Sequence, residues 1–171
     1  MPTSVGILLC YHLYMNTRTL GIFALCTGAS LLAGFYGSTA TVPNITTWYA
    51  TLVRPVWTPP NWLFMPVWSI LYVLMGSAVA LVWTSKRKKK LLPVAFFFAH
   101  LVLNVSWSIV FFGNHDPRTA LFVIGALWLS ILVMMIWYWR YSRLATYLLV
   151  PYIVWVSYAS TLNLGIVILN P

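Results

Sequence analysis

The side chains in this chain that could do chemistry are aromatic rather than acidic or basic. The sequence holds ten tryptophans, ten tyrosines and nine phenylalanines, but a single acidic residue, Asp116. Hydrolysis and acid-base catalysis need a nucleophile paired with a base, or clustered carboxylates, and the chain has neither. Two cysteines, Cys10 and Cys26, indicate neither a disulfide framework nor a metal site. The aromatic residues therefore carry the functional argument.

Aromatic and polar residues recur at helical spacing in two of the apolar stretches. Trp68 and Tyr72 are four residues apart and so share one face of a helix. In the next stretch a second face is spaced four, three and four, and it consists of His100, Asn104, Trp107 and Phe111. An ionisable side chain within an apolar span is a functional candidate by default. For His100 we favour a neutral, hydrogen-bonded imidazole over the alternative, a haem ligand, and for Asn104 alone we favour helix packing.

A third face lies in the last apolar stretch. Pro151 lies inside the predicted helix, so its ring should kink the helix and free the carbonyl of Tyr147. The residues that follow on one face combine two large aromatic groups with a small one, and they are Tyr152, Trp155, Ala159 and Leu162. If the three faces converge, they form an aromatic cavity with few polar groups, suited to a large, flat, mostly apolar ligand.

The segment before the second stretch is rich in proline and tryptophan. It begins with Trp48 and Tyr49 and ends with Trp57, Pro59 and Pro60. Because proline fixes φ and removes a backbone donor, this pattern predicts a stiff, extended lid. The alternative for each tryptophan is an aromatic belt at the level of the lipid headgroups, although a belt does not explain the proline spacing.

Five stretches free of Asp, Glu, Lys and Arg must position these residues. They run approximately over residues 19–38, 63–85, 91–112, 119–139 and 144–169, and as helices rising about 1.5 Å per residue they can cross a hydrocarbon core about 30 Å thick. Hydrophobic residues make up 61% and charged residues 6% of the chain, which excludes a water-soluble globule. A β-barrel would show alternating polarity. The sequence predicts an all-α membrane protein, a single domain over residues 1–171 built as a five-transmembrane-helix bundle.

Basic residues set the expected orientation in the lipid bilayer. The net charge is +9, but half of the basic residues form the run 86–90, which indicates topology rather than nucleic-acid binding. Arg18, this run, Arg140 and Arg143 fall on one side, against Arg54 and Arg118 on the other. The N-terminus and the Lys86 to Lys90 loop are therefore expected in the cytoplasm and the C-terminus on the opposite side. Attraction of the run to anionic lipid follows from its charge.

Residues 1–16 are expected to be an extension of the domain. Their apolar part, residues 5–14, is too short to span a membrane and lacks the basic region and cleavage site of a signal peptide. An interfacial segment and a true start at Met15 instead of Met1 both remain open.

Four motifs resemble one known family. The sequence reads W-Y-x-x-L-x-x-P-x-W-x-P-P from Trp48, F-x-x-V-W-x-x-L-Y-x-x-x-G from Phe64, L-N-x-x-W from Leu103 and P-Y-x-x-W-x-x-Y-A-x-x-L-N from Pro151. Together, in this order over about residues 20–165, they are similar to the translocator protein family, also called tryptophan-rich sensory proteins or peripheral benzodiazepine receptors.

The resemblance implies a bundle that is commonly a homodimer and that binds tetrapyrroles such as protoporphyrin IX as ligands, with no cofactor required. It implies a lid formed by Trp48, Tyr49, Trp57, Pro59 and Pro60. With the faces described above, the expected ligand-binding residues of the helices are Trp68, Tyr72, His100, Asn104, Trp107, Tyr152, Trp155, Ala159 and Leu162. In bacterial members the tryptophans matching Trp68 and Trp155 are associated with light-dependent porphyrin breakdown, so these two are the candidate catalytic residues.

One departure from the family pattern concerns cholesterol. Animal members carry a cholesterol motif that ends in a basic residue near the C-terminus, whereas this chain has no Lys or Arg after Arg143. We therefore expect a tetrapyrrole rather than a sterol. Three functional classes stay open: a receptor, a transporter of porphyrins or sterol-like lipids, and an enzyme only in the sense of tryptophan-assisted photo-oxidation. Ion-coupled transport is disfavoured because the spans lack Asp, Glu, Lys and Arg.

Overall fold

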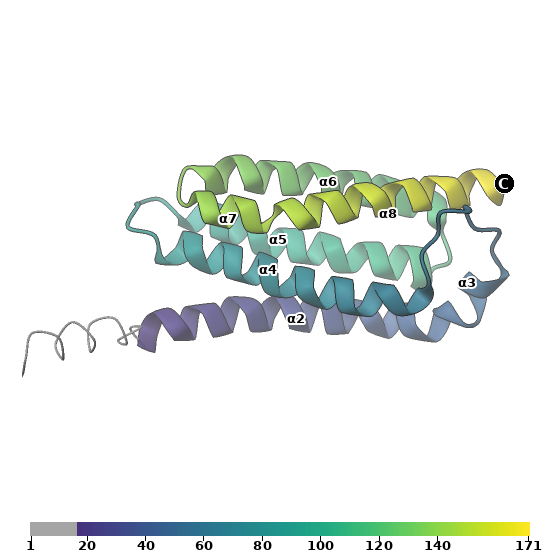
Figure 1. Cartoon of the computed structure of the whole chain (residues 1–171), viewed down its shortest axis with the longest axis horizontal. Coiled ribbons are helices and arrows are strands. Elements are labelled where there is room, and N and C mark those ends of the chain that lie inside the picture. The colour runs from purple at the N-terminus through teal and green to yellow at the C-terminus, as the bar shows by residue number, and fades with distance from the viewer. Residues whose placement is uncertain (1–16) are drawn as a thin grey trace, which may run out of the picture.

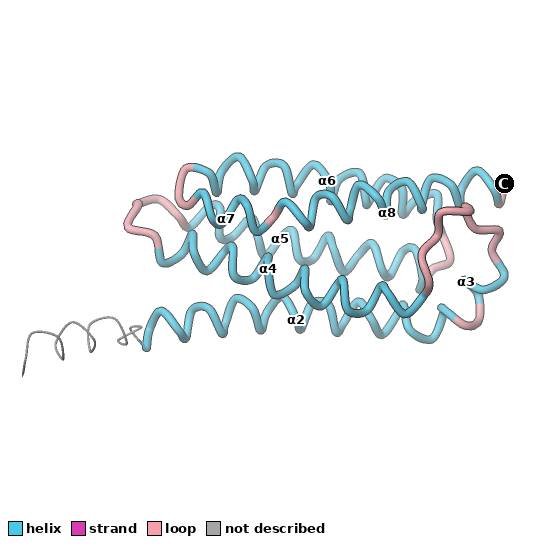
Figure 2. The backbone as a smooth tube through the Cα atoms, viewed as in Figure 1, coloured by secondary structure: helices cyan, strands magenta, loops and turns pink. Residues whose placement is uncertain are grey.

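Five long helices lie side by side in the computed structural model, which describes residues 17–171 (Figure 1). All five are long and apolar enough to cross a membrane, which confirms the predicted five-helix membrane fold. No strand occurs in the described part of the chain (Figure 2). The elements are α2 (Thr17–Ile45), α3 (Trp48–Thr51), η1 (Asn61–Leu63), α4 (Phe64–Thr84), α5 (Leu91–Ser108), η2 (Ile109–Gly113), α6 (Pro117–Trp139), α7 (Arg143–Leu148) and α8 (Val150–Leu169). The predicted N-terminal segment 5–14 lies outside the described residues.

The first helix is longer than the sequence predicts. Its predicted end was at residue 38, where Ser and Thr residues begin, but α2 continues to Ile45. The hydroxyl groups of Ser38, Thr39 and Thr41 donate to helix carbonyls one turn earlier, at 2.6, 2.7 and 3.2 Å. Because these polar groups are satisfied within the helix, they do not end it. The first loop consequently starts at Thr46 rather than Thr39, and it contains the short helix α3.

The last span is broken where the sequence predicts a kink. The helix divides into α7 and α8 at Leu149, two residues before Pro151. Pro151 then lies in the first turn of α8, where its missing N–H leaves no hydrogen bond unmade. The third span holds a feature that the sequence did not predict: a π-helical turn, η2, that extends α5. Such turns are rare and frequently lie at functional sites.

Asp116, the single acidic residue, caps α6. Its carboxylate accepts a hydrogen bond from the backbone N–H of Thr119 at 3.0 Å, and Pro117 follows in the first turn. Hydrogen bonds from Thr119 lower the pKa of this exposed carboxyl group. Asp116 therefore has a structural role.

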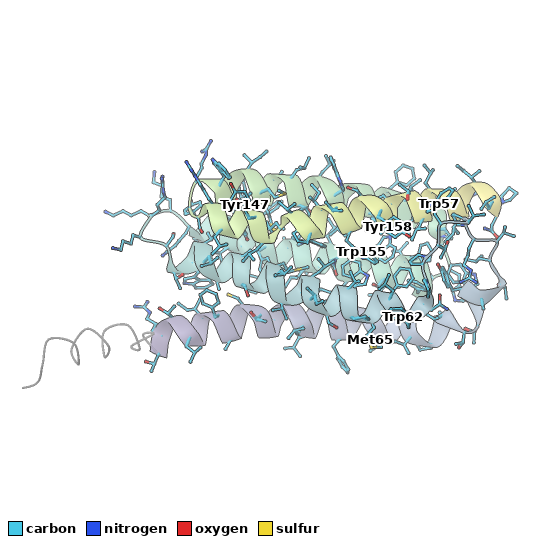
Figure 3. All side chains as sticks on the ribbon, in the orientation of Figure 1. Trp57, Trp62, Met65, Tyr147, Trp155 and Tyr158 are labelled. Carbon is cyan, nitrogen blue, oxygen red and sulfur yellow. The ribbon has the colours of Figure 1, made fainter. Side chains whose placement is uncertain are left out.

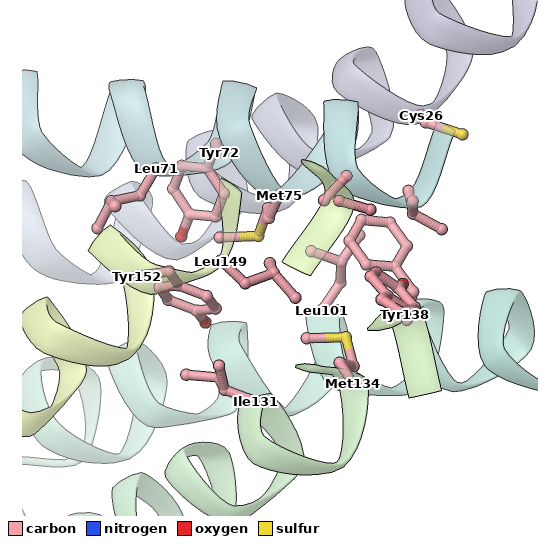
Figure 4. Packing of buried hydrophobic residues seen from close by; sticks show 14 of the residues in the cluster. Cys26, Leu71, Tyr72, Met75, Leu101, Ile131, Met134, Tyr138, Leu149 and Tyr152 are labelled. Atoms are coloured by element: carbon pink, nitrogen blue, oxygen red, sulfur yellow. The ribbon is translucent and has the colours of Figure 1, made fainter. Parts of the chain in front are cut away.

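Helices α2 and α4 pack with their backbones in close approach. A Cβ atom on Gly76 would lie 2.6 Å from Cα of Thr27 and 2.9 Å from the carbonyl oxygen of Cys26. Small residues permit such contact between membrane helices. Around this crossing, Figure 4 shows side chains from several helices meeting in one buried core, and those labelled include Cys26, Met75, Met134, Tyr138 and Leu149.

The two ends of the bundle differ in charge. The start of α2, the α4–α5 loop and the α6–α7 turn lie at one end, and the first loop and the C-terminus lie at the other (Figure 1). Eight of the ten basic residues therefore gather at the end where α2 begins. This grouping agrees with the segments that the sequence analysis placed together, while the cytoplasmic assignment of that end stays a prediction.

Candidate functional site

A cavity of about 660 Å³ lies at the end of the bundle beneath the first loop. Its walls come from α2, α4, the α5–η2 junction and α8, and the elements α3 and η1 close its end. Its volume falls within the range of small-molecule sites, about 300–1,000 Å³. Among the predicted ligand-binding residues, those that line it are Tyr49, Trp68, Tyr72, Trp107, Ala159 and Leu162. The three predicted helix faces therefore do converge, although not with all their members.

The cavity offers mainly apolar and aromatic contact. Asn163 lines it, but its amide donates to the carbonyl of Pro117 at 2.8 Å and its oxygen accepts from Trp107 Nε1 at 3.2 Å. Ser38 and Ser69 also line it, and both hydroxyl groups donate to carbonyls of their own helices. A ligand here would be held by shape and aromatic surface more than by new hydrogen bonds.

Four predicted ligand-binding residues form a hydrogen-bonded network, one of them in the cavity wall and three behind it. Tyr72, in the wall, donates to Asn104 Oδ1 at 2.7 Å, and Asn104 Nδ2 donates to the hydroxyl of Tyr152 at 2.9 Å. The Tyr152 hydroxyl lies 3.0 Å from His100 Nε2, and His100 Nδ1 lies 2.7 Å from Ser130 Oγ. His100, Asn104 and Tyr152 are buried and do not line the cavity.

The hydrogen bond made by Ser130 determines which group donates in each contact of this network. Ser130 donates its hydroxyl hydrogen to the carbonyl of Leu127 at 2.6 Å, so its oxygen accepts from His100 Nδ1–H. His100 Nε2 must then accept from Tyr152, whose oxygen accepts from Asn104. This is the neutral, hydrogen-bonded histidine favoured from the sequence. Because both ring nitrogens are engaged, the network gives the haem-ligand alternative no free nitrogen.

Trp68 and Trp155 occupy different positions. Trp68 lines the cavity, and its ring centre lies 5.7 Å from that of Tyr72 and 6.2 Å from that of Tyr152. Trp155 is not among the lining residues, and its ring lies edge-on to that of Phe64, a lining residue, with 6.0 Å between ring centres. The buried indole N–H of Trp155 has no hydrogen-bond partner among residues 17–171. Only Trp68 of the two candidate catalytic residues can touch a ligand in this cavity.

The first loop is hydrogen-bonded to α8 and to Asn170, the residue that follows it. Asn170 makes two hydrogen bonds with the backbone of Val53, at 3.0 and 2.9 Å, and Tyr158 donates to the carbonyl of Trp57 at 2.6 Å. Figure 3 shows Trp57 and Tyr158 on this side of the bundle. Pro55 is buried against Gly165, where a Cβ atom would collide with the proline ring. Glycine at position 165 thus lets the loop approach the helix.

Other predicted lid residues do not face the cavity. Trp57 is 53% exposed, which suits the belt role. Pro59 and Pro60 line a separate, open hollow of about 680 Å³ on the outer side of the loop. Trp48 stacks on His115, with ring centres 4.5 Å apart, and contacts Phe111 edge-on. Trp48 therefore supports the cavity wall without lining it.

The cavity wall contributed by α2 was not predicted from the sequence. Apolar residues surround this helix on all sides, so no face stands out, and the lining residues include Leu31, Gly34, Phe35 and Val42. The glycine at position 34 was a signal in the sequence for this close helix contact, because a Cβ atom there would collide with the ring of Tyr72. Met65 and Trp62 were also missed. Phe35, Trp62 and Met65 line the cavity and are also 70%, 71% and 68% exposed, so each reaches both the cavity and the outer surface of the bundle.

The polar residues give no sign of a metal centre. In the described residues no three His, Cys, Asp or Glu side chains gather where they could hold a metal ion.

Tyr49 lines the cavity at the end beneath the first loop. Burial raises the pKa of its phenol, and the nearby Arg54 opposes this shift in part. Tyr49 is therefore a neutral wall residue at physiological pH.

Comparison with known proteins places the chain in a family. The sequence profile of the TspO/MBR family matches residues 26–169. The tryptophan-rich protein TspO of Chlorobaculum tepidum is 45% identical over 159 residues, which cover 92% of this chain and 100% of that protein. The translocator protein of Homo sapiens is 37% identical over 123 residues, covering 68% and 70%, and the tryptophan-rich sensory protein of Cereibacter sphaeroides is 37% identical over 126 residues, covering 72% and 77%. This chain is a multi-pass membrane protein that belongs to the TspO/MBR family.

Proposed function

We propose that this protein is a membrane receptor for a flat, largely apolar tetrapyrrole such as protoporphyrin IX, bound in the cavity beneath the first loop. The observation that carries the proposal is the composition of the walls: Trp68, Tyr72, Trp107 and Phe111 surround a space of about 660 Å³ whose polar groups are mostly engaged. Burial of a macrocycle contributes about 25 cal/mol per Å² of apolar surface. This gain offsets the cost of ordering ligand and loop and supports at least micromolar affinity.

The relatives' names support a ligand-handling role. One relative is called a translocator protein and another a tryptophan-rich sensory protein. Translocation and sensing both require a site for the molecule concerned, and the cavity supplies one. The side-chain wall between α2 and α4, with Phe35 and Met65 exposed, would let an apolar ligand exchange with lipid, which suits a translocator as well as a receptor.

Arg54, in the first loop, is a candidate partner for the carboxylates of a porphyrin. The guanidinium of Arg54 lies 5.4 Å from the ring centre of Tyr49, and it donates to Asn61 Oδ1 at 3.5 Å. Tyr49 and Asn61 both line the cavity. A carboxylate at the mouth of the cavity would thus lie near the positive charge of Arg54, which suits an amphipathic tetrapyrrole better than a neutral sterol.

Two ligands and two variants test this assignment. Protoporphyrin IX and its dimethyl ester are titrated against the purified protein and against Arg54→Gln, with quenching of tryptophan fluorescence as the readout. Arg118→Gln is the matched control, since Arg118 lies at the same end of the bundle, in the first turn of α6. Arg54→Gln should weaken binding of the acid by about tenfold, or 1.4 kcal/mol, and leave the ester unchanged. Equal loss for both ligands would contradict the carboxylate contact, and no saturable quenching in the parent would refute the tetrapyrrole receptor.

Light-dependent breakdown of the bound porphyrin is a second candidate function. The observation that favours it is Trp68 in the cavity wall, where an excited ligand or the oxygen species it forms could oxidise the indole directly. The protein would then supply placement and an electron-rich partner rather than acid and base groups. Porphyrin loss under light, compared with free porphyrin in the same detergent, separates this activity from binding alone.

A further inference from the structure

We propose that Tyr152 and His100 form a redox-active pair that takes over the oxidising equivalent from Trp68. The pair lies behind the cavity wall, where neither residue lines the cavity. The inference rests on the proposed function only for the natural oxidant, a photoexcited tetrapyrrole. The pair itself follows from ring distances and hydrogen bonds within the chain.

Trp68 connects the cavity to the pair. Its ring lines the cavity and lies 6.2 Å from the ring of Tyr152, at an interplanar angle of 70°. Tyr152 is fully buried, so a ligand in the cavity does not reach it directly. A one-electron oxidant in the cavity removes an electron from Trp68, and the resulting indole radical cation is within one ring contact of a phenol.

The proton of Tyr152 has a positioned acceptor. A phenol becomes much easier to oxidise when its proton leaves together with the electron, and a base within hydrogen-bonding distance makes that transfer possible. Tyr152 donates to His100 Nε2 at 3.0 Å, and the network fixes this nitrogen as the unprotonated one, because Nδ1–H donates to Ser130. The amide of Asn104 donates to the Tyr152 oxygen at 2.9 Å and remains to stabilise it after the proton has left.

The step balances in electrons, protons and charge. The oxidant gains one electron and Trp68 becomes a radical cation. Tyr152 then gives one electron to Trp68, which returns to a neutral indole, and gives its proton to His100 Nε2, which leaves a neutral tyrosyl radical beside an imidazolium. The positive charge moves from the indole to the imidazole, so no additional charge is created in the low-dielectric interior. Return of the electron and proton restores the starting state.

A second tyrosine at the same tryptophan provides an internal control. The ring centre of Tyr72 lies 5.7 Å from that of Trp68, which is closer than the 6.2 Å between Trp68 and Tyr152. The Tyr72 hydroxyl, however, donates to the amide oxygen of Asn104 at 2.7 Å. An amide oxygen is not a base that takes up the proton. Tyr158 is in ring contact with Trp155, with 5.5 Å between ring centres, and its hydroxyl donates to the backbone carbonyl of Trp57, which is not a base either. The geometry therefore selects Tyr152 among the tyrosines in contact with these two tryptophans.

The test generates the radical in two ways and observes it by electron paramagnetic resonance. In one arm an ultraviolet laser flash ionises indoles of the ligand-free protein in the presence of an electron scavenger. In the other arm visible light excites added protoporphyrin IX. Tyr152→Phe is compared with the matched variant Tyr72→Phe, which also removes one buried hydroxyl group. His100→Gln keeps a hydrogen-bond acceptor for Tyr152 but removes the base.

In the ultraviolet arm the parent should form a tyrosyl radical that Tyr152→Phe loses and Tyr72→Phe keeps, while His100→Gln should slow its formation on the order of 100-fold. Ring-deuterated tyrosine in the unaltered protein should narrow the spectrum, which identifies the radical without any substitution. A tryptophanyl spectrum alone in the parent, or equal loss in the two Tyr→Phe variants, would overturn the pair. If the radical forms under ultraviolet light but not with porphyrin, the pair stands and the proposed ligand chemistry fails.

Discussion

Trp68 and Trp155 carry the same indole in different surroundings, and this difference decides what each can do. Trp68 lines the cavity, whereas Trp155 does not and contacts the lining residue Phe64 instead. The sequence motifs do not distinguish the two residues, because spacing places each on a helix face but does not show which of them reaches the cavity. We therefore expect any photochemistry at Trp68 first.

We expect Trp68→Phe to reduce light-dependent porphyrin loss much more than it reduces affinity, because phenylalanine keeps most of the stacking area but not the easily oxidised indole. Trp155→Phe is the matched variant and should have the smaller effect. The measurement is the degradation rate divided by the amount of bound porphyrin. If Trp68→Phe degrades bound porphyrin as fast as the parent does, Trp68 is a packing residue and the protein only binds.

Asn104 joins Tyr72 and Tyr152 across three helices, and its replacement should destabilise the bundle. Asn104→Leu leaves two hydroxyl groups without this partner in the interior, so the free energy of unfolding should fall by about 1–2 kcal/mol. Ser160→Ala, which removes only a bond within its own helix, should stay close to the parent. Thermal unfolding in detergent measures both. Equal stability of Asn104→Leu and the parent would mean that the network adds nothing to the fold.

Helices and their ends were predictable to different degrees. Stretches of about 20 residues without charge predict membrane helices because the bilayer requires internal hydrogen bonds over that length. The predicted end of α2 is too early, since Thr39 and Thr41 are typical of a loop although their hydroxyl groups donate within the helix. The π-helical turn η2 and the partnership of Ser130 with His100 depend on contacts between helices, which sequence spacing does not encode.

The first loop should work as a lid through its contact with α8. In Gly165→Ala the new methyl group would collide with Pro55, so the loop should dock less well and porphyrin affinity should fall by about three- to tenfold, or about 1 kcal/mol. Gly125→Ala is the matched control, because a Cβ atom there has no neighbour within 4 Å. Comparable affinities for the two variants in the same fluorescence titration would show that the lid position does not matter for binding.

Replacement of Pro59 and Pro60 together by glycine tests a different property of the same loop, its stiffness. Both prolines lie on the outer hollow and not in the cavity, so any effect on the ligand must come from the loop's conformational freedom. We expect weaker binding with an intact bundle. Unchanged affinity would reduce this part of the loop to an interfacial anchor.

The whole molecule has a basic end and an end that contains the cavity. Eight of ten basic residues lie where α2 begins, and the cavity lies at the other end beneath the first loop. The positive-inside rule predicts that the basic end faces the cytoplasm. A homodimer, implied by the family resemblance, also stays a prediction, and it would use the lipid-facing surfaces of the bundle.

Cysteine labelling checks the orientation. A single cysteine at Lys88 should react with a membrane-impermeant maleimide only after the cytoplasmic face is opened, and one at Pro171 should react from the opposite face. Cys26 is buried and should not react, and Cys10 is replaced by serine in both variants. The reverse pattern would invert the topology and place the ligand cavity toward the cytoplasm.

Titration of the purified protein with protoporphyrin IX decides most directly whether the cavity is a tetrapyrrole site. Trp68 and Trp107 line the cavity, so a bound porphyrin should quench their fluorescence with a saturable, micromolar or tighter dependence, and Trp68→Phe should remove a large part of the quenched signal. In Gly34→Leu the new side chain would collide with the ring of Tyr72, so it should displace this wall residue and abolish saturable quenching, while circular dichroism checks that the bundle stays helical. Linear, non-saturable quenching that is the same in the parent and in Gly34→Leu would contradict the assignment.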